Sequence, residues 1–243
     1  MYFTQTDIDG KKRGSELYTS LRTAEAFEVS PQLAIVGRNA AERPALEAYI
    51  ANKFATTYGA TLREFLPFFL LLRAKQGVAG VLGMRRGIQG HGLFVEQYMD
   101  APAEQLLGNL LGRPVARSSL VEIGNLVSSW RGSSQMLFIA LAAQICRAGA
   151  EWAVFTATPE VQKLLSRLRV EQYALCEADG RRLGLQLAEW GSYYDSKPKV
   201  IAVNARHALK IFSKQAMTAM LLNTCHRQLA EVAESQNLRA LYE

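Results

Sequence analysis

The sequence is poor in the residues that form disulfides or zinc sites. It has three cysteines, Cys146, Cys176 and Cys225, with no Cys-x-x-Cys spacing. An odd number of widely separated cysteines argues against a disulfide framework and against a cysteine-rich zinc site. We therefore expect a protein suited to a reducing, cytoplasmic environment.

The histidines show no metal-binding pattern either. His91, His207 and His226 lie far apart, and no two of them stand in a His-x-His or His-x-x-x-His spacing. Because metal sites usually draw on closely spaced ligands, we predict no protein-bound metal and no tightly bound cofactor.

Long hydrophobic runs are also missing. Uninterrupted apolar runs, such as Leu66–Leu72, are short, far shorter than the roughly 20 residues that cross a bilayer. The first residues, MYFTQTDIDGKKRG, contain no apolar stretch typical of a signal peptide. We expect no transmembrane segment and no cleaved export signal.

Charge of one sign is not concentrated anywhere. Lys and Arg number 28 against 22 Asp and Glu, for a net charge of +6, but the basic residues are scattered in small groups. Nucleic-acid binding usually needs a dense basic stripe with interleaved aromatic residues, so no nucleic-acid partner is predicted. The mild positive field fits an acidic protein partner, a CoA phosphate or an anionic membrane surface equally well.

The composition is that of a globular chain with a full core. Of the 243 residues 49% are apolar and 21% charged, which indicates one domain with an extension or two small domains. Residues 1–30 are polar and show no sustained period, so we predict a loosely ordered arm there. A main domain over 31–205 and an amphipathic helical extension over 206–243 complete the predicted organisation.

The first half of the main domain predicts helices and a hairpin. Residues 42–59 have helical spacing with proline early and glycine at the end. Two apolar runs within 67–86 predict a β-hairpin, and 92–98 a third strand. Asp100 is expected to cap a short helix that ends near Gly112.

The second half predicts a strand–helix–strand–helix unit. Its parts are a strand at 118–128, an apolar helix at 135–147, a strand at 152–156 and a helix at 160–168 started by Thr158 and Pro159. Such a unit makes its two strands parallel, while the hairpin makes the sheet mixed. Weaker strand candidates follow at 172–176, 185–190 and 199–203. The apolar stripe of the terminal helices predicts core packing or a homodimer contact rather than a membrane anchor.

An open sheet with two parallel strands places a cleft at their carboxyl ends. The residues expected there are 125–134 and the pair Thr156 and Thr158. Within the cleft, Arg131–Ser134 has the glycine, hydroxyls and arginine of a phosphate-binding turn. An ordinary helix start capped by Ser133 or Ser134 explains the same residues equally well.

Polar residues interrupt otherwise apolar strands. If Glu96 or Glu122 faces the cleft, partial burial should raise its pKa and make it a candidate general base. A neighbouring tyrosine, Tyr193 or Tyr194, could donate a proton to a leaving group. The alternative is that each glutamate points outward or pairs with an arginine. No Gly-x-Ser-x-Gly elbow is present, which disfavours a serine hydrolase.

Four segments together resemble the thermostable hemolysin family, over roughly residues 42–205. They are LFVEQYMDAPAEQLL (93–107), GRPVARSSLVEIGNLVSS (112–129), WAVFTAT (152–158) and WGSYYDSKP (190–198).

That family resembles the GNAT-like N-acetyltransferase fold, and within it the acyl-homoserine-lactone synthases. The resemblance implies an α/β (α+β) fold whose mixed, mostly antiparallel sheet has a central splayed pair of parallel strands, with helices on both faces and extra C-terminal helices. In such folds the thioester arm of acyl-CoA or acyl-carrier protein enters between the splayed strands. Glu122 and Asn125 would then lie beside the thioester and the amine, with backbone N–H groups near Asn125 and Leu126 polarising the carbonyl.

The resemblance has one departure. GNAT-like enzymes prefer Arg/Gln-x-x-Gly-x-Gly/Ala for CoA pyrophosphate, whereas Ser134 and Met136 occupy the places of the small residues here. An acyl-carrier protein docks through its acidic surface, so its binding would depend less on this turn.

The predicted function is an N-acyltransferase that moves an acyl group from an acyl-carrier protein or acyl-CoA to the amine of a small metabolite or amino acid. Glu96 or Glu122 would be the base, and Tyr193 or Tyr194 the acid. Alternatives are a non-catalytic, membrane-active protein and a ligand-binding pseudo-enzyme of the same fold. The residues expected to contact donor or acceptor are Gln97, Tyr98, Asn125, Leu126, Arg131, Gly132, Ser133, Ser134, Thr156, Thr158, Trp190 and Asp195.

Overall fold

The hairpin predicted at 67–86 forms the centre of one half of the sheet. This computed structural model describes residues 32–75, 77–129 and 132–235, with side chains to residue 230. In it β2 spans Phe68–Ala74 and β3 spans Gly77–Arg86. Both strands are almost continuously apolar because both faces of the sheet are covered. Leu70 and Leu72 pack into one core, whereas Phe69 and Leu71 pack into another on the opposite face.

Seven strands form one sheet in the order β1-β2-β3-β4-β5-β7-β6. Every neighbouring pair is antiparallel except β4 with β5, which is parallel. This confirms the predicted mixed, mostly antiparallel sheet with one parallel pair. The remaining strands are β1 (Gln32–Val36), β4 (Leu120–Ser128), β5 (Trp152–Ala157), β6 (Tyr173–Glu177) and β7 (Lys199–Asn204).

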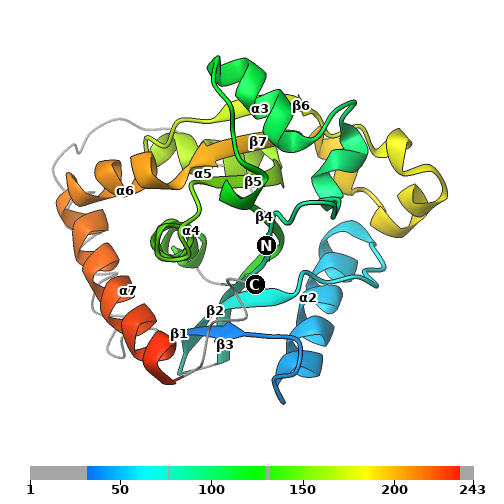
Figure 1. Cartoon of the computed structure of the whole chain (residues 1–243). Helices are drawn as coiled ribbons and strands as arrows, with labels where there is room; N and C mark the ends of the chain where they lie inside the picture. The colour runs from blue at the N-terminus through cyan, green and yellow to red at the C-terminus, as the bar shows by residue number, and fades with distance from the viewer. Residues whose placement is uncertain (1–31, 76, 130–131, 236–243) are drawn as a thin grey trace, which may run out of the picture. The chain divides into compact units, whose positions relative to one another are not determined.

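Helices cover both faces of the sheet, as predicted (Figure 1). One face holds α4, which contacts β2, β3, β4 and β5 and is itself packed against α6 and α7. The opposite face holds α2, whose Leu46, Ile50 and Phe54 share a core with β2 and β3. The helices are α2 (Arg43–Tyr58), α3 (Ala103–Leu111), α4 (Ser133–Arg147), α5 (Pro159–Arg167), α6 (Ala205–Ser213) and α7 (Ala216–Ser235).

The two C-terminal helices bury Phe212, Cys225 and Leu229 in the same core as α4. Of the helices in the described part of the chain, none combines the length and apolarity needed to cross a bilayer. The arm expected at 1–30 lies outside the described residues, and the division of the chain near residue 205 stays a prediction.

Two predicted strands are wrong. Residues 94–98 form the 3-10 helix η1 (Phe94–Tyr98), because the Glu96 carboxylate accepts the Leu93 backbone N–H and bends the chain into a turn. Residues 185–190 belong to the 3-10 segment η3 (Gly180–Trp190), in which Gly184 has a φ of 58° that breaks any extended run. In contrast, β1 was not anticipated, since its five residues are too short to show a clear period.

Two predicted helix caps also differ. The helix α3 begins after Pro102, and Asp100 instead forms an ion pair with Arg182 at 2.6 Å. Thr158 does occupy the N-cap position of α5, with Pro159 next, but its hydroxyl makes no capping hydrogen bond. Helix starts of this kind rely on the fixed φ of proline more than on the side-chain cap.

Candidate active site

The strands β4 and β5 pair along only part of their length. Their parallel register runs from Leu120–Trp152 to Ile123–Phe155. Beyond that pair β4 continues to Ser128 and β5 to Ala157, and among these described residues no further register joins the two strands. The central parallel pair therefore parts at its carboxyl end.

The parted half of β4 contains a bulge. Its register with β3 shifts between the pairs Gly83–Gly124 and Val81–Val127, and Asn125 has a φ of 51°. A bulge leaves one residue out of the hydrogen-bonded ladder and re-aims the neighbouring groups. The Asn125 carboxamide oxygen accepts the Leu66 backbone N–H at 3.0 Å, so the loop before β2 is held over the bulge.

Glu122 lies in the paired half of β4 and is 2% exposed. Its Oε2 accepts hydrogen bonds from Arg85 Nε at 2.9 Å and Nη2 at 2.5 Å, and its Oε1 accepts the Val95 backbone N–H at 2.8 Å. Arg85 stands directly opposite Glu122 in the β3–β4 register. The carboxylate thus anchors η1 to the sheet as well as pairing with an arginine.

Glu96 is held even more completely. Its carboxylate accepts hydrogen bonds from both terminal nitrogens of Arg117, at 2.5 and 2.9 Å, and from the backbone N–H groups of Leu93 and Ala103. Burial alone would raise the pKa of Glu96, but these hydrogen bonds outweigh it and lower the pKa below its usual value. The expected rise of this pKa is therefore wrong, because the donors stabilise the charged form.

An aromatic cluster lies beside these carboxylates, where η1 packs on β5 and η3. Tyr98 is 2% exposed, and its hydroxyl lies 2.5 Å from the Tyr194 hydroxyl. Tyr194 belongs to the 3-10 helix η4 (Tyr193–Ser196), and its ring centre lies 5.8 Å from that of Trp190. Phe94 completes the cluster at 5.6 Å from Trp190.

The tyrosines of the cluster keep their protons far above neutral pH. Burial raises the pKa of Tyr194 to about 12. Burial and the neighbouring Tyr194 raise the pKa of Tyr98 further still. Tyr193 is also buried, with a raised pKa, but it faces Tyr58 of α2, at 5.2 Å between ring centres. Both predicted proton donors pack against Trp190, and Tyr194 is the one that is half-exposed.

The turn after β4 starts α4 with a glycine. Gly132 occupies the N-cap position with a φ of 88°, and no side chain caps the helix. The predicted caps Ser133 and Ser134 are therefore wrong as caps, because both already lie inside the helix. The Ser133 hydroxyl lies 2.5 Å from that of Ser128 at the end of β4. Arg131 lies outside the described residues.

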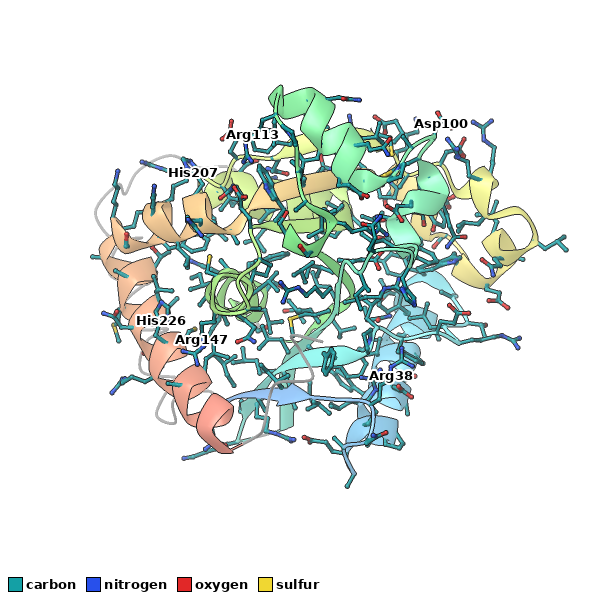
Figure 2. All side chains as sticks on the ribbon, in the orientation of Figure 1. Arg38, Asp100, Arg113, Arg147, His207 and His226 are labelled. Atoms are coloured by element: carbon teal, nitrogen blue, oxygen red, sulfur yellow. The ribbon has the colours of Figure 1, made fainter. Side chains whose placement is uncertain are left out.

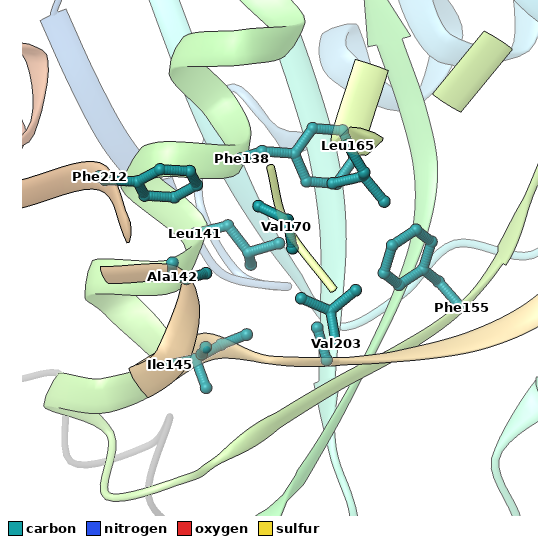
Figure 3. A pocket seen from close by; sticks show the side chains of 12 residues that line it. Phe138, Leu141, Ala142, Ile145, Phe155, Leu165, Val170, Val203 and Phe212 are labelled. Carbon is teal, nitrogen blue, oxygen red and sulfur yellow. The ribbon is translucent and has the colours of Figure 1, made fainter. Parts of the chain in front are cut away.

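The end of β5 borders an apolar cavity under α4. Phe155 and Phe138 form a tilted pair at 5.9 Å between ring centres. The cavity next to them measures about 20 Å³, and its walls come from α4, α5, α6, β5 and β7 (Figure 3). Such a volume holds one water-sized group. Thr156 is half-buried and Thr158 buried at the adjoining strand end.

The structure thus gathers the predicted residues into two groups. The first group lies on the η1 side of the sheet and comprises Glu96, Glu122, Tyr98, Tyr194 and Trp190, with Tyr193 packed between this group and α2. A second group, at the parted strand ends, comprises Asn125, Leu126, Gly132, Ser133, Ser134, Thr156 and Thr158.

Two predicted residues and the histidines fall outside both groups. Gln97 and Asp195 are exposed and have no side-chain hydrogen bond among the described residues. His207 lies on α6 and His226 on α7 (Figure 2). Within the described ranges, no three histidine, cysteine or carboxylate residues are grouped as metal ligands.

Sequence reasoning missed the arginines that hold the two carboxylates. Arg117 is buried and also bonds to Glu104 at 2.7 Å. Arg85 lies near the end of the otherwise apolar strand β3, a position that could have signalled a partner on the neighbouring strand. Phe94 was missed because its segment was taken for a strand.

Solved structures share this architecture. The acyl-homoserine lactone synthase LasI matches with a TM-score of 0.50 and 12% identity, over 74% of this chain and 94% of LasI. BjaI, described as a CoA-dependent acyl-homoserine lactone synthase with SAM and isopentyl-CoA, matches with a TM-score of 0.50 and 9% identity, over 76% of this chain and 89% of BjaI. At these identities the likeness establishes the fold, which is the GNAT-like fold of acyl-homoserine lactone synthases.

The family follows from the sequence itself. The thermostable hemolysin family model matches residues 36–209. Because this covers well over half of the chain, the protein belongs to the thermostable hemolysin family. No curated protein matches the sequence.

Proposed function

We propose that this protein is an N-acyltransferase that moves an acyl group from a thioester to an amine. The observation that supports this most is the parting of β4 and β5 after Ile123–Phe155, with a bulge in β4 at the same level. A thioester arm lying between the strand ends would meet backbone N–H groups near Asn125 and Leu126. Such groups stabilise the oxyanion that forms on the carbonyl oxygen.

The donor in this proposal is acyl-CoA or an acyl-carrier protein, and it enters from the α4 side. The N-cap residue of α4 is Gly132, which has no side chain to cover the start of the helix, and a helix N-terminus of this kind suits a phosphate group of either donor. BjaI, which shares the fold, is described as CoA-dependent. The acceptor is the amine of a small metabolite or amino acid, and it approaches from the side of the tyrosine cluster.

Between the two candidate bases, the contacts favour Glu122. The Glu96 carboxylate already accepts four hydrogen bonds, two of them from Arg117, and its lowered pKa makes it a poor proton acceptor. Glu122 accepts three hydrogen bonds, two from Arg85 on Oε2 and one from the Val95 backbone N–H on Oε1. Its Oε1 therefore keeps a free lone pair, whereas each oxygen of Glu96 accepts two bonds. We assign the uptake of the amine proton to Glu122.

Between the two candidate acids, the packing favours Tyr194. It is protonated at neutral pH, with a pKa of about 12, and half-exposed, whereas Tyr193 is buried against α2. In the reaction the amine nitrogen attacks the carbonyl carbon, the C–N bond forms and the C–S bond breaks. The departing thiolate takes the Tyr194 proton.

The proposal is tested by incubating the purified protein with acyl-CoA donors from acetyl to decanoyl and a pool of amino acids and small amines. Free thiol and new amides are measured. The protein should form an amide with at least one donor, and Glu122→Gln and Tyr194→Phe should each lower kcat by about 10²-fold or more. Tyr173→Phe serves as the matched control, because Tyr173 of β6 packs its ring on Trp152 and, among the described residues, makes no ring contact with Tyr98 or Tyr194.

Two results would contradict the proposal. The first is unchanged kcat in both Glu122→Gln and Tyr194→Phe, which would remove the two assignments. The second is release of dye from liposomes by the purified protein without any acyl donor, together with no amide formation. That pair of results would favour the membrane-active alternative that the family description suggests.

A further inference from the structure

We infer that Tyr98 is a positioning residue in this reaction, whose hydroxyl holds that of Tyr194 and stabilises the phenolate left when Tyr194 gives up its proton. The inference rests on the proposed function. It assigns Tyr98 a role through Tyr194 in place of the direct contact with the thioester that the sequence suggested.

The first support is the contact itself. The two hydroxyl oxygens lie 2.5 Å apart although the residues are 96 positions apart in the chain. A phenol can donate one hydrogen bond and accept another. If Tyr98 donates to Tyr194, the Tyr194 proton stays free to move to a leaving group. The same bond then points a donor at the oxygen that becomes negative.

The second support is that Tyr98 cannot easily move. Its ring is buried in a core that includes Leu120, Trp152 and Val154, and Phe94 packs against it at 5.9 Å between ring centres. The 3-10 helix that bears it is fixed at both ends. Fixed donors stabilise a developing charge best because they need no reorganisation when the charge appears.

The anchors of that helix are the two carboxylates. Glu122 Oε1 holds the Val95 backbone N–H, just before Tyr98. Glu96 holds the N–H groups of Leu93 and Ala103, which lie on either side of it. Glu96 therefore helps to position Tyr98 and does not act as a base.

The third support concerns Tyr194 itself. Its ring passes directly over Gly180, where an added Cβ atom would lie 2.7 Å from Tyr194 Cγ. Trp190 packs on the ring as well, edge to face. Among the described residues, Tyr98 provides the only hydrogen bond to the Tyr194 hydroxyl. A phenolate at this position would otherwise have no donor from the described part of the chain.

The charges around the pair make such a donor necessary. The carboxylate of Glu122 acts on Tyr98 electrostatically and disfavours negative charge on the pair, as does the neighbouring Tyr193. When the C–S bond breaks, the sulfur takes the Tyr194 proton and the phenolate oxygen accepts the Tyr98 O–H. Tyr98 keeps its own proton. The proton taken from the amine by Glu122 later returns through solvent to Tyr194.

The test compares two leaving groups. One donor is the acyl-CoA found active, whose alkyl thiolate needs a proton. The other has the same acyl group on 4-nitrothiophenol, whose thiolate leaves without one. Tyr98→Phe should lower kcat about tenfold or more with acyl-CoA, as expected for a lost hydrogen bond to a charged oxygen. With the aryl donor it should lower kcat less than about twofold.

The double variant Tyr98→Phe/Tyr194→Phe gives a second readout. Because Tyr98 acts through Tyr194, the double variant should be no slower with acyl-CoA than Tyr194→Phe alone. Tyr173→Phe again serves as the control. Should Tyr98→Phe not fold, 3-fluorotyrosine at position 98 keeps the ring shape and strengthens the donor. It should then raise kcat with acyl-CoA and leave the aryl donor unchanged.

The outcomes distinguish a failure of the role of Tyr98 from a failure of the proposed acyltransferase function. Equal losses on both donors, or losses that multiply in the double variant, would overturn the role of Tyr98 and leave the acyltransferase standing. If the unmodified protein forms no amide from either donor, the proposed function fails and the role of Tyr98 with it.

Discussion

The two halves of β4 differ although they belong to one strand. The half Leu120–Ile123 is buried, lies between β3 and β5, and pairs with both. The half Gly124–Ser128 is mostly half-exposed, contains the bulge and keeps only β3 as a partner. In the paired half, Glu122 holds Arg85 and the Val95 backbone N–H. In the parted half, the backbone groups that face β5 have no pairing with that strand. The comparison indicates that Leu120–Ile123, which is paired on both sides, fixes the position of the gap between Gly124–Ser128 and β5.

The largest expected effect comes from removing the anchor of the paired half. Glu122→Ala leaves the Arg85 guanidinium and the Val95 N–H without their partner. Breaking a buried pair in this way costs about 3–5 kcal/mol. Urea denaturation should show a lower free energy of unfolding by that amount. An unchanged midpoint would mean that Glu122 does not hold η1 on the sheet.

A smaller effect is expected at the second carboxylate. Glu96→Gln weakens the bonds to Arg117 and should lower the free energy of unfolding by about 1.5–3 kcal/mol at neutral pH. Because the contacts lower the pKa of Glu96 in the fold, its contribution is complete above the usual pKa near 4.5. It is lost as the pH falls through the lower folded value.

The measurement is a urea titration of both proteins from pH 7 to pH 3. The difference between unmodified protein and Glu96→Gln should shrink below about pH 4.5. A difference that stays constant with pH would show that the charge of Glu96 contributes nothing. Glu104→Gln, a second change beside Arg117, tells whether the effect is specific to Glu96.

The bulge in the parted half allows a matched pair of changes. Asn125→Gly keeps the positive φ without strain and loses only the bond to Leu66, which costs about 1 kcal/mol. Asn125→Val adds the steric penalty of a left-handed residue, about 1–2 kcal/mol more. Thermal melts should therefore rank the unmodified protein first, Asn125→Gly second and Asn125→Val last. Equal melting temperatures for the two variants would argue against the bulge.

The smallest effects are expected at two exposed residues that the sequence placed in the site. Gln97→Ala and Asp195→Ala remove side chains without hydrogen-bond partners among the described residues. Each should change the free energy of unfolding by less than about 0.5 kcal/mol. A large loss of stability or of amide formation in either variant would mean that these side chains act in the site.

The parallel pair could be predicted because its signals are local. The apolar run of α4 between two short apolar strands indicates a strand–helix–strand unit, and the hairpin at β2 and β3 follows from its turn. The 3-10 helix at Phe94–Tyr98 could not be predicted in the same way. Its conformation depends on Glu122 and Arg117, which are distant in sequence.

The site was predictable in its residue types more than in its arrangement. The motif around Glu122 and the pair Tyr193–Tyr194 could be picked out from the sequence. The sequence could not show which of these two tyrosines contacts Tyr98. Tyr193 packs against Tyr58 of α2, whereas Tyr194 faces Tyr98 of η1. The direction of the Glu96 pKa was also out of reach, since it depends on hydrogen bonds that only the fold creates.

The parting of β4 from β5 can be measured directly by interstrand nuclear Overhauser effects in isotope-labelled protein. Backbone contacts should appear between the two strands for the pairs from Leu120–Trp152 to Ile123–Phe155. None should connect residues 125–127 of β4 with Thr156 or Ala157. A ladder of contacts that continues to Ala157 would contradict the account.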